Sequence, residues 1–456
     1  MRFCSITLGC KVNQYETQGI AGILISRGHM QTEADEGCDV CIINTCAVTA
    51  ESVRKSRQAI RRLKKLAPDA IIAVCGCLSQ LDPGAADELG ADLVGGSGDR
   101  HSFALAIEEL WNAECRMQNA ELSIDPSPPD TSTLAPSPRE LSAKLTEGVN
   151  PPVSQRFEEL PPGVAAGRTR ALLKIQDGCD NYCAYCIIPY ARGSARSLPV
   201  ERAADYARKL DEQGFREIVV TGIEISSYGK DLVSRSSLSD VIHTISNAAP
   251  RARLRLGSLD PGIVTDMLCR ELYAVPSLCD HFHLSLQSGC DETLRRMGRK
   301  YDTSAAYKAI SALRRSFPGC GITADLIVGF PGETDAEFEQ TMIFIKTARF
   351  SDMHIFPFSA RPGTKAADMP EQVMKSVKRE RARITASTAE DLARLFRLSQ
   401  IGKTLEVLFE RKRDGYWTGH SRNYLEVTVK GVVAKNSVHN VQIASVKDDL
   451  IWGEKI

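Results

Sequence analysis

The sequence lacks an excess of charge of either sign. Its 456 residues contain 57 Lys and Arg against 57 Asp and Glu, which gives a formal net charge of zero. A positive field over the whole molecule is therefore excluded as the way it holds a nucleic acid, although a local basic patch is not. Hydrophobic residues make up 43% of the chain, enough for several cores, so wholesale disorder is excluded as well.

Long hydrophobic runs are also absent. No run approaches the roughly 18 apolar residues of a membrane-spanning helix, and the first residues, Met1–Leu8, carry no apolar signal core. The 15 cysteines are an odd number and fall well below the roughly 8–10% that is typical of disulfide scaffolds. We therefore expect a soluble cytoplasmic protein without a membrane partner, whose cysteines are reduced thiols available as metal ligands.

The length corresponds to about three domains of roughly 150 residues each. In the first hundred residues, short apolar runs alternate with amphipathic helical patterns. The runs are Phe3–Leu8, Val40–Ile43 and Ala70–Val74. Strand, helix and strand in this order predict an open parallel sheet in an N-terminal α/β domain, residues 1–112.

A second and longer β/α alternation fills the centre of the chain. Helices such as Glu201–Gln213 and Ser304–Ser316 are predicted between six strands. The predicted strands are Ala171–Ile175, Glu217–Thr221, Arg253–Gly257, His281–Leu286, Ile322–Val328 and Met353–Phe356. This pattern predicts a partial (β/α) barrel, residues 167–398, that ends in helical sequence over Glu371–Leu398.

Two further segments differ in composition. Nine of the 21 prolines stand between Asp125 and Gly163, so residues 113–166 are predicted to be a Pro-rich linker or insertion, mostly disordered. From Lys403 to Ile456, apolar and polar residues alternate between Gly, Asn and Asp turn signals. Residues 399–456 are therefore predicted to form a small all-β barrel or sandwich.

The most specific motif is Gly178-Cys179-Asp-Asn-Tyr-Cys183-Ala-Tyr-Cys186, directly after the first strand of the central domain. The spacing C-x3-C-x2-C puts three thiolates on one loop, and three ligands on a four-iron cluster leave one iron open. A closed zinc site needs four ligands, and no His or Cys follows close by to supply the fourth. The motif therefore predicts a [4Fe-4S] cluster.

This motif and its surroundings resemble the radical S-adenosylmethionine (SAM) superfamily. In that family the open iron takes the amino and carboxylate groups of SAM, and an electron from the cluster cleaves SAM to a 5′-deoxyadenosyl radical. The resemblance includes the aromatic Tyr185, whose counterpart lies near the adenine. It implies SAM as a cofactor and an external electron donor such as flavodoxin or ferredoxin.

Polar residues stand at the carboxyl ends of the predicted barrel strands, where active sites form in barrels. In similar SAM barrels these positions line the amino-acid, ribose and adenine pockets, so the resemblance implies that Glu224, Ser258 and Gln287 bind SAM. Each of them alone is as well explained as a satisfied turn or cap. His281 and His283 alternate on one strand and are predicted to be packed or hydrogen-bonded rather than ligands.

A second constellation lies in the N-terminal domain, at Cys10, Cys46 and Cys77. The gaps of 36 and 31 residues are too long for a local knuckle, but each cysteine comes just past the carboxyl end of a predicted parallel strand. Those ends face one crevice in an open α/β sheet. Three buried thiols are the alternative, but the shared loop position favours a second three-cysteine cluster. Cys75, two residues before Cys77, is predicted to lie on the strand and not to be a ligand.

Both constellations in this order resemble the methylthiotransferases. These are radical SAM enzymes with an N-terminal cluster domain, a central SAM barrel and a C-terminal TRAM domain that binds RNA. The resemblance covers nearly the whole chain except the Pro-rich segment. It implies two [4Fe-4S] clusters: one on Cys179, Cys183 and Cys186 that drives radical generation, and one on Cys10, Cys46 and Cys77 that presents a methylated sulfur.

Within the family, Thr7-Leu-Gly-Cys-Lys-Val-Asn-Gln-Tyr-Glu-Thr17 looks like the branch that acts on N6-threonylcarbamoyladenosine at position 37, in the anticodon loop of tRNA. The isopentenyladenosine branch more often has Gly-Cys-Gln-Met-Asn there, and the branch acting on ribosomal protein S12 has Gly-Cys-Pro-Lys-Asn. The implied reaction replaces C2–H with S–CH3, with SAM as both radical source and methyl donor. That C–H bond is unactivated, so acid–base chemistry alone does not break it.

Two basic segments are candidates for RNA contacts. Arg54–Lys65 holds seven basic residues in twelve and directly follows the Cys46 loop, although a basic helix is often only a solvated face. Arg411-Lys-Arg413 lies near Tyr416 and Trp417 in the C-terminal domain and combines phosphate contacts with rings for stacking on bases.

Two functions of other classes remain open from the sequence. A two-cluster electron-transfer protein would use six ligand cysteines, but it needs neither a barrel of this size nor an RNA-binding tail. A zinc-stabilised RNA-binding module would need no catalysis. Iron and sulfide analysis separates zinc from iron, and SAM cleavage under dithionite separates an enzyme from a carrier.

Overall fold

The computed structural model describes residues 1–122, 141–143, 145, 155–161 and 168–456, and they form two compact units. The first unit comprises Met1–Ala165 together with Gly178–Asp180 and Ile187–Ser194. The second comprises Ala166–Asp177, Asn181–Cys186 and Ala195–Ile456. In the described part of the chain, no helix is both long and apolar enough to cross a membrane.

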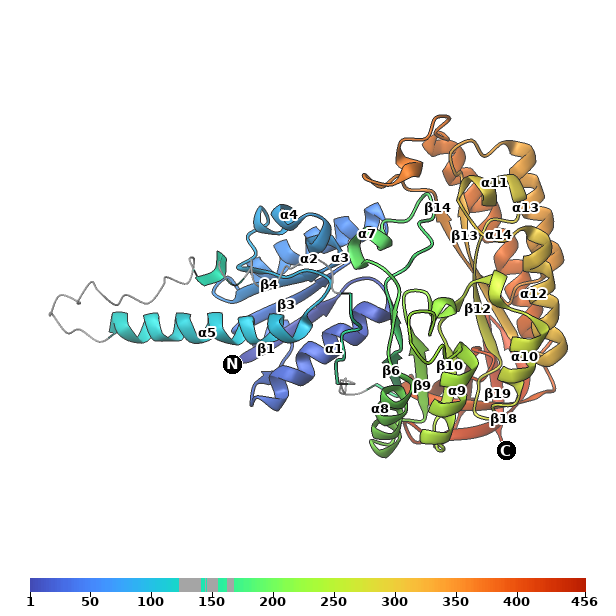
Figure 1. Cartoon of the computed structure of the whole chain (residues 1–456). Coiled ribbons are helices and arrows are strands. Elements are labelled where there is room, and N and C mark those ends of the chain that lie inside the picture. Colours follow the sequence, from blue (N-terminus) through green and yellow to red (C-terminus); the bar gives the residue numbers. More distant parts are fainter. Residues whose placement is uncertain (123–140, 144, 146–154, 162–167) are drawn as a thin grey trace. The chain divides into compact units, whose positions relative to one another are not determined.

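The first unit is built on a parallel sheet with the strand order β2-β1-β3-β4-β5. Its strands are β1 (Arg2–Thr7), β2 (Met30–Gln31), β3 (Val40–Thr45), β4 (Ile71–Gly76) and β5 (Leu93–Val94). Helices α1 (Lys11–Ser26) and α5 (Arg100–Leu122) lie on one face, and α2 (Ala50–Leu66) covers the other (Figure 1). Strands β3 and β4 are buried along their whole length, as the apolar runs predict for a sheet covered on two faces.

The described part of the Pro-rich segment is ordered against this unit. Helix α5 continues to Leu122, past residue 112, and Leu160 is fully buried next to Gly19. The carbonyl oxygen of Leu160 accepts a hydrogen bond of 2.6 Å from the hydroxyl of Tyr15. The predicted disorder is therefore wrong for this stretch, because an apolar residue anchors it. Residues 123–140, 144, 146–154 and 162–167 lie outside the described residues, and the four-part domain division stays a prediction.

The second unit begins with the predicted β/α alternation, in two parallel sheets ordered β10-β9-β6 and β11-β12-β13-β14. The strands are β6 (Arg170–Lys174), β9 (Glu217–Thr221), β10 (Arg253–Leu256), β11 (Ser258–Leu259), β12 (His281–Gln287), β13 (Gly321–Val328) and β14 (Asp352–Pro357). The helices are α8 (Val200–Glu212), α9 (Leu238–Ala248), α10 (Asp266–Tyr273), α11 (Asp291–Arg296), α12 (Thr303–Ser316), α13 (Asp335–Ala348) and α14 (Lys375–Leu398) (Figure 1). All six predicted strands are present.

The ladder of this partial barrel breaks at Gly257, the residue at which the predicted strand Arg253–Gly257 ends. The chain pairs with β9 through β10 and, after Gly257, pairs with β12 through β11. A Cβ atom at Gly257 would lie 3.2 Å from the carbonyl oxygen of Val220, so the backbones approach closely at the switch. The predicted strand Arg253–Gly257 corresponds to β10, and the short strand β11 that follows it was not predicted.

The chain ends in a closed barrel with the strand order β15-β16-β17-β19-β18, as predicted for residues 399–456. Its strands are β15 (Thr404–Arg413), β16 (Tyr416–Ser421), β17 (Glu426–Lys430), β18 (Val438–Lys447) and β19 (Leu450–Lys455). Apolar residues at alternate positions, such as Val407, Phe409 and Val427, fill its core. This small all-β domain packs against the partial barrel within the second unit.

A buried ionic group holds the small barrel to the partial barrel. Glu217 on β9 binds Arg253 at 2.7 Å and Arg255 at 2.8 Å, both on β10. Burial acts to raise the pKa of Glu217, but the two guanidinium groups outweigh it and hold this pKa well below its usual range. The same guanidinium groups donate to backbone carbonyl oxygens of the small barrel, those of His420 (2.8 Å), Ser421 (3.1 Å) and Arg422 (2.9 Å).

An aromatic ring of the small barrel completes this junction. Tyr424 stacks on His281 of β12 with the ring centroids 4.6 Å apart, and the guanidinium of Arg255 lies 4.7 Å from the Tyr424 ring centroid. His281 Nε2 also lies 3.1 Å from Thr323 Oγ1. The prediction that His281 is a packed, hydrogen-bonded residue is confirmed.

Candidate cluster and cofactor sites

The three N-terminal cysteines lie at one edge of the first sheet. Cys46 directly follows β3, Cys77 directly follows β4 and begins helix α3 (Cys77–Leu81), and Cys10 caps the start of α1 after β1. Because β1, β3 and β4 are adjacent and parallel, their carboxyl ends meet at this edge. We call these three residues the N-terminal triad.

Two glycines allow the loops of the N-terminal triad to approach each other. Gly9 has φ +105°, and a Cβ atom there would lie 2.8 Å from Cβ and 2.9 Å from Sγ of Cys46. Gly76 has φ +113°, and a Cβ atom there would lie 2.4 Å from the carbonyl oxygen of Thr45. Any other residue at either position would push the cysteine loops apart, because both the space and the backbone conformation require glycine.

The thiols of the N-terminal triad lie close enough for their charges to interact in every pairing: Cys10 with Cys46, Cys46 with Cys77, and Cys77 with Cys10. Burial raises the pKa of Cys46 and of Cys77. Arg192 acts in the opposite direction on both pKa values. Cys75 is buried on β4, as predicted. Burial raises the pKa of Cys75 to about 11, and the strongest opposing effect comes from the positive charge of Arg100.

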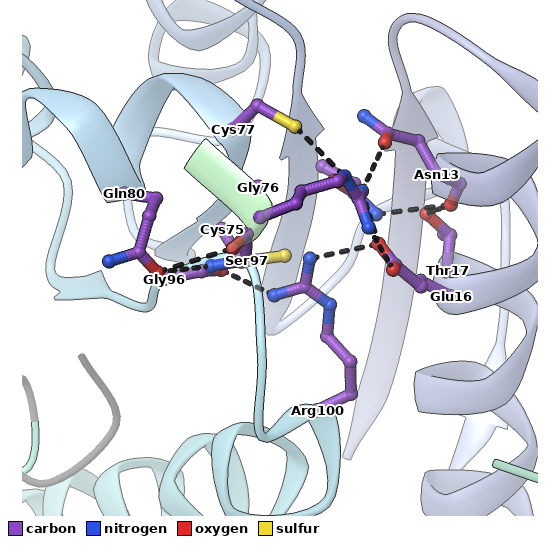
Figure 2. A network of polar contacts seen from close by, with 12 residues as sticks. Asn13, Glu16, Thr17, Cys75, Gly76, Cys77, Gln80, Gly96, Ser97 and Arg100 are labelled. Carbon is purple, nitrogen blue, oxygen red and sulfur yellow. Dashed lines mark hydrogen bonds and ion pairs between the residues drawn. The ribbon is translucent and has the colours of Figure 1, made fainter. Parts of the chain in front are cut away.

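No sequence motif marks Arg192, which lies fully buried beside the N-terminal triad. It ends the short helix α7 (Ile188–Arg192), a part of the first unit. Its Nε donates to Cys77 Sγ at 3.3 Å, its Nη1 to Glu16 at 2.7 Å and its Nη2 to Asn13 at 2.8 Å. Figure 2 shows Cys77, Asn13 and Glu16 around this network. The guanidinium thus joins a cysteine sulfur to helix α1.

The charged groups of this network are two guanidinium groups and two carboxylates. Glu16 binds Arg100 at 2.9 Å as well as Arg192, and all three side chains are fully buried (Figure 2). The second carboxylate, that of Glu158, accepts a hydrogen bond from the backbone N–H of Arg100, and its charge acts on the Arg100 guanidinium. Asn13 donates to the carbonyl oxygens of Leu8 and Thr45, both at 2.9 Å, which ties the loop before Cys10 to the one before Cys46. The buried guanidinium of Arg192 would stabilise an anionic cluster with thiolate ligands at this position.

The C-x3-C-x2-C motif, which we call the loop triad, is divided between the two units. Cys179 belongs to the first unit, where its N–H donates to the carbonyl oxygen of Gly193 at 3.0 Å. Cys183 and Cys186 belong to the second unit and lie on one tight turn, with the Cys186 N–H bound to the Cys183 carbonyl oxygen at 2.9 Å. Convergence of all three sulfurs on one cluster stays a prediction from the spacing.

Arg299 has the same relation to the loop triad as Arg192 has to the N-terminal triad. Its Nη1 donates to Cys183 Sγ at 3.3 Å, and its Nη2 binds Asp260 at 2.8 Å. Its Nη2 also lies 3.2 Å from the carbonyl oxygen of Ser285 near the end of β12. No sequence motif marks Arg299 either, since all of these partners are distant along the chain.

Two of the four residues that the resemblance assigns to SAM lie near Arg299. Tyr185 is half-buried against Phe330, and burial raises its pKa well above the usual value. Glu224 is half-buried and accepts a hydrogen bond of 3.2 Å from the N–H of Ser226. Burial raises the pKa of Glu224, an effect that Asp260 adds to and Arg299 opposes.

The other two lie on neighbouring strands of the same sheet. Ser258 begins β11, is exposed, and stands beside His283 in the strand register. Gln287 ends β12 after a register shift and has φ +64°. Both positions are at or beyond strand ends as predicted, and their contact with SAM stays a prediction.

The basic segments lie on regular elements. Arg54–Lys65 falls within α2, where Arg54 binds Glu51 at 2.5 Å and Lys64 donates to the carbonyl oxygen of Gly90 at 2.8 Å. Arg411, Lys412 and Arg413 end β15, and Tyr416 begins β16 across a tight turn. Arg411 binds Glu426 at 3.0 Å, and all three basic side chains are exposed.

Two family models match the chain. The radical SAM superfamily matches residues 173–345, and uncharacterized protein family UPF0004 matches residues 2–95. The threonylcarbamoyladenosine tRNA methylthiotransferase MtaB of Bacillus subtilis is 34% identical over 431 residues, which cover 93% of this chain and 89% of that protein. The chain belongs to the radical SAM methylthiotransferase family. Family members thus include enzymes that carry a [4Fe-4S] cluster, use SAM and require an electron donor.

The chain is also similar to a second tRNA-modifying enzyme and to a solved radical SAM structure. The tRNA-2-methylthio-N(6)-dimethylallyladenosine synthase of Pelotomaculum thermopropionicum is 32% identical over 437 residues, covering 93% of this chain and 91% of that protein. The solved structure of the radical SAM methyltransferase TsrM from Kitasatospora setae has a TM-score of 0.54 at 16% identity and covers 80% of this chain and 75% of that one. The latter similarity concerns the fold alone.

Proposed function

We propose that this enzyme transfers a methylthio group to C2 of N6-threonylcarbamoyladenosine at position 37 of tRNA. The observation that carries the proposal is the presence of two cysteine triads, each with a buried arginine donating to one sulfur at 3.3 Å. In the reaction the hydrogen atom of C2 would pass to the carbon radical derived from one SAM, and C2 would then bond to the sulfur held at the N-terminal triad, whose cluster would take up the electron released. A second SAM would supply the methyl group. The name of the Bacillus subtilis relative supports the choice of nucleoside.

The loop triad would hold the cluster that the superfamily uses with SAM. Cys183 and Cys186 on one turn, with Cys179 four positions before Cys183, suit a cluster with one open iron. When bound, the cluster and SAM supply the one-electron chemistry that breaks an unactivated C–H bond. Arg299 would balance the charge at Cys183, and Tyr185, Glu224, Ser258 and Gln287 would hold the groups of SAM.

The N-terminal triad would hold a second [4Fe-4S] cluster, which carries the sulfur to be transferred. Its residues fit such a group because three thiols whose charges interact lie at one sheet edge, two glycines keep the loops close, and Arg192 supplies a buried positive charge. Arg192 would stabilise the deprotonated form of Cys77 that a metal ligand requires.

Binding of the tRNA anticodon loop is proposed for the basic end of the small barrel. Arg411, Lys412 and Arg413 are exposed there, and Tyr416 offers a ring for stacking on a base. A tRNA substrate supports the proposal that the enzyme acts in the cytoplasm. Flavodoxin or ferredoxin would serve as the electron donor.

The test is mass spectrometry of tRNA nucleosides from a strain without the gene. We expect 2-methylthio-N6-threonylcarbamoyladenosine to disappear and to return with the wild-type gene, but not with Cys179, Cys183 and Cys186 changed to Ala. Loss of the isopentenyl-derived nucleoside alone would instead assign the enzyme to the other tRNA substrate. Unchanged nucleosides would contradict both assignments and favour a carrier or a binding module.

A further inference from the structure

Three cysteines outside both triads bring their thiols together on the first sheet: Cys4 on β1, Cys41 on β3, and Cys38 in the loop just before β3. Cys38 Sγ lies 3.3 Å from Cys41 Sγ and 3.6 Å from Cys4 Sγ. All three sulfurs lie within 4.8 Å of one another. We call these residues the amino-end cysteines, because they lie toward the amino ends of β1 and β3.

The strand register brings two of the amino-end cysteines together. Cys4 and Cys41 are direct partners in the parallel ladder of β1 and β3, so their side chains point to the same face of the sheet. That face is the one covered by α2, since both cysteines belong to one buried cluster with Ile60 and Leu63 of this helix. Cys38 turns its sulfur toward the pair from the loop that leads into β3.

The amino-end cysteines lie apart from the N-terminal triad. Cys41 precedes Cys46 by five residues, and a strand rises about 3.3 Å per residue, so roughly 16 Å of extended chain separates the two. On β1, the strand continues from Cys4 to Thr7 before the loop that carries Cys10. The sheet therefore carries cysteine groups at two different places along the same strands.

The charges around the amino-end cysteines favour a cation. The hydrogen bond from the Cys41 thiol is the main reason why the pKa of Cys4 falls to about 7, and the same bond raises the pKa of Cys41. The carboxylates of Glu33 and Asp39 act against thiolates here, because they raise the pKa of Cys4 and of Cys38, respectively. In both triads an arginine donates to a sulfur. Here a bound cation would supply the positive charge.

We propose that the amino-end cysteines bind one Zn²⁺ ion. In a tetrahedral site with Zn–S bonds of about 2.3 Å, neighbouring sulfurs lie about 3.8 Å apart. The sulfur separations of 3.3 Å and 3.6 Å at Cys38 need only small movements to reach this value. Three thiolates leave the fourth position for water. Cys38 is half-buried, so the ion can enter at this residue. The zinc site is independent of the methylthio transfer proposed above.

Other metal groups fit the amino-end cysteines less well. Each cysteine of a four-iron cluster binds a different iron, so its sulfurs are held further apart than around a single ion. Cu⁺ is also bound by thiolates. With three thiolates, however, Cu⁺ leaves one more negative charge than Zn²⁺ does, close to the carboxylates of Glu33 and Asp39.

Two explanations without a metal account for less of the arrangement. Free cysteine is a common core residue, and Cys4 and Cys41 are buried. Packing alone does not require the half-buried Cys38 to turn its sulfur toward them. A disulfide between Cys38 and Cys41, which are spaced C-x-x-C, would use two of the three thiols and leave Cys4 without a role.

The experiment measures zinc in the full-length enzyme after both triads have been loaded with iron and sulfide. The protein is incubated anaerobically with Zn²⁺ and desalted, and its zinc and iron are measured by mass spectrometry of the elements. X-ray absorption at the zinc edge then identifies the zinc ligands in the presence of iron. The test variant is Cys38→Ser, because Cys38 is half-buried and lies outside the strand. The matched control is Cys115→Ser, a half-buried cysteine on α5.

We expect the wild type to retain about one zinc per chain, bound by about three sulfurs at about 2.3 Å. Cys38→Ser should lose most of this zinc and Cys115→Ser should keep it, while both hold as much iron as the wild type. Cys77→Ala should also keep the zinc, because this change affects the N-terminal triad and not the amino-end cysteines.

Several results would overturn the zinc site. They are a wild type that retains no zinc, equal zinc in Cys38→Ser, equal loss in Cys115→Ser, loss in Cys77→Ala, and zinc bound by oxygen and nitrogen alone. Iron in place of zinc would overturn it in favour of a third cluster. A Cys38–Cys41 disulfide, found by alkylation and mass spectrometry under the same anaerobic conditions, would overturn it in favour of a redox pair. Methylthiolation is not a readout, so the proposed function and the zinc site can fail separately.

Discussion

The N-terminal triad and the loop triad differ in how the chain brings their sulfurs together. The loop triad spans eight residues, Cys179–Cys186, and its spacing is visible in the sequence. The N-terminal triad depends on three strands being adjacent and parallel, with glycine before Cys10 and before Cys77. In both, the arginine that contacts a sulfur is remote: Arg192 is 115 residues from Cys77, and Arg299 is 116 residues from Cys183. The cysteines of a triad can be close in the sequence, but the positive charge beside their sulfurs comes from an arginine that only the fold brings near.

The largest effect should come from removing one triad at a time. Anaerobically reconstituted enzyme should hold about eight irons, two clusters of four. Changing Cys179, Cys183 and Cys186 together to Ala should leave about four and abolish SAM cleavage, whereas changing Cys10, Cys46 and Cys77 should leave about four and keep it. Iron and sulfide analysis with SAM cleavage under dithionite is the measurement. Loss of all iron in either variant would mean that the triads are not independent sites.

A single substitution should distinguish the two cysteines at the end of β4. Cys77→Ala should lose the N-terminal cluster, because Cys77 Sγ lies in the network of Arg192 and the other two thiols. Cys75→Ala should keep both clusters, since Cys75 lies on the strand and interacts with Arg100 instead. Iron content of the two variants is compared side by side, and the reverse result would make Cys75 the ligand.

The arginines should each affect only their own triad. Arg192→Gln removes one of two cations on buried Glu16 and should cost roughly 3 kcal/mol of unfolding free energy. It should also lower the reduction potential of the N-terminal cluster, because a nearby positive charge favours the reduced state. Arg299→Gln should do the same for the loop cluster. Redox titration followed by electron paramagnetic resonance in variants that carry one cluster is the measurement, and a shift at the opposite triad would contradict the comparison.

Changes in the small barrel should have the smallest effect on the two triads and should leave the iron content unchanged. Changing Arg411, Lys412 and Arg413 to Ala should weaken tRNA affinity. It should also reduce the slope of log K against log salt by about 0.7–0.9 for each phosphate that the protein no longer neutralises. Methylthiolation should recover at high tRNA concentration, as expected when binding is weakened and the chemical step is intact.

The control for the small barrel removes the same charge elsewhere. Arg202, Arg208 and Lys209 on helix α8 are changed together to Ala, and this variant should bind tRNA like the wild type. Binding is measured at several salt concentrations for both variants. Equal weakening in both would indicate a general charge effect and remove the small barrel from the proposed RNA interface.

The sequence predicted the strands, the sheet edge and the cysteines because these follow from local patterns: apolar periods, Gly-Cys pairs and fixed spacings. Arg192 and Arg299 were missed, since a lone Arg has no pattern of its own and each has its partners on other elements. The short helix that carries Arg192 is preceded by the loop triad, and this position was the only local signal. The strand β11 after Gly257 was missed because its two residues are too few to show an apolar period.

The junction between the partial barrel and the small barrel has a consequence for how this enzyme can evolve. Arg253 and Arg255 hold the small barrel by its backbone carbonyl oxygens, which are present whatever side chains the strand carries. Substitutions away from Glu406, Glu410 and Tyr424, whose side chains also contact the partial barrel, can therefore accumulate, and the outer surface of the small barrel can adapt to different RNAs while the attachment persists. The small barrel can diverge in sequence but cannot be exchanged or deleted. Its removal would expose Glu217 to solvent and take away the carbonyl oxygens that the two guanidinium groups bind.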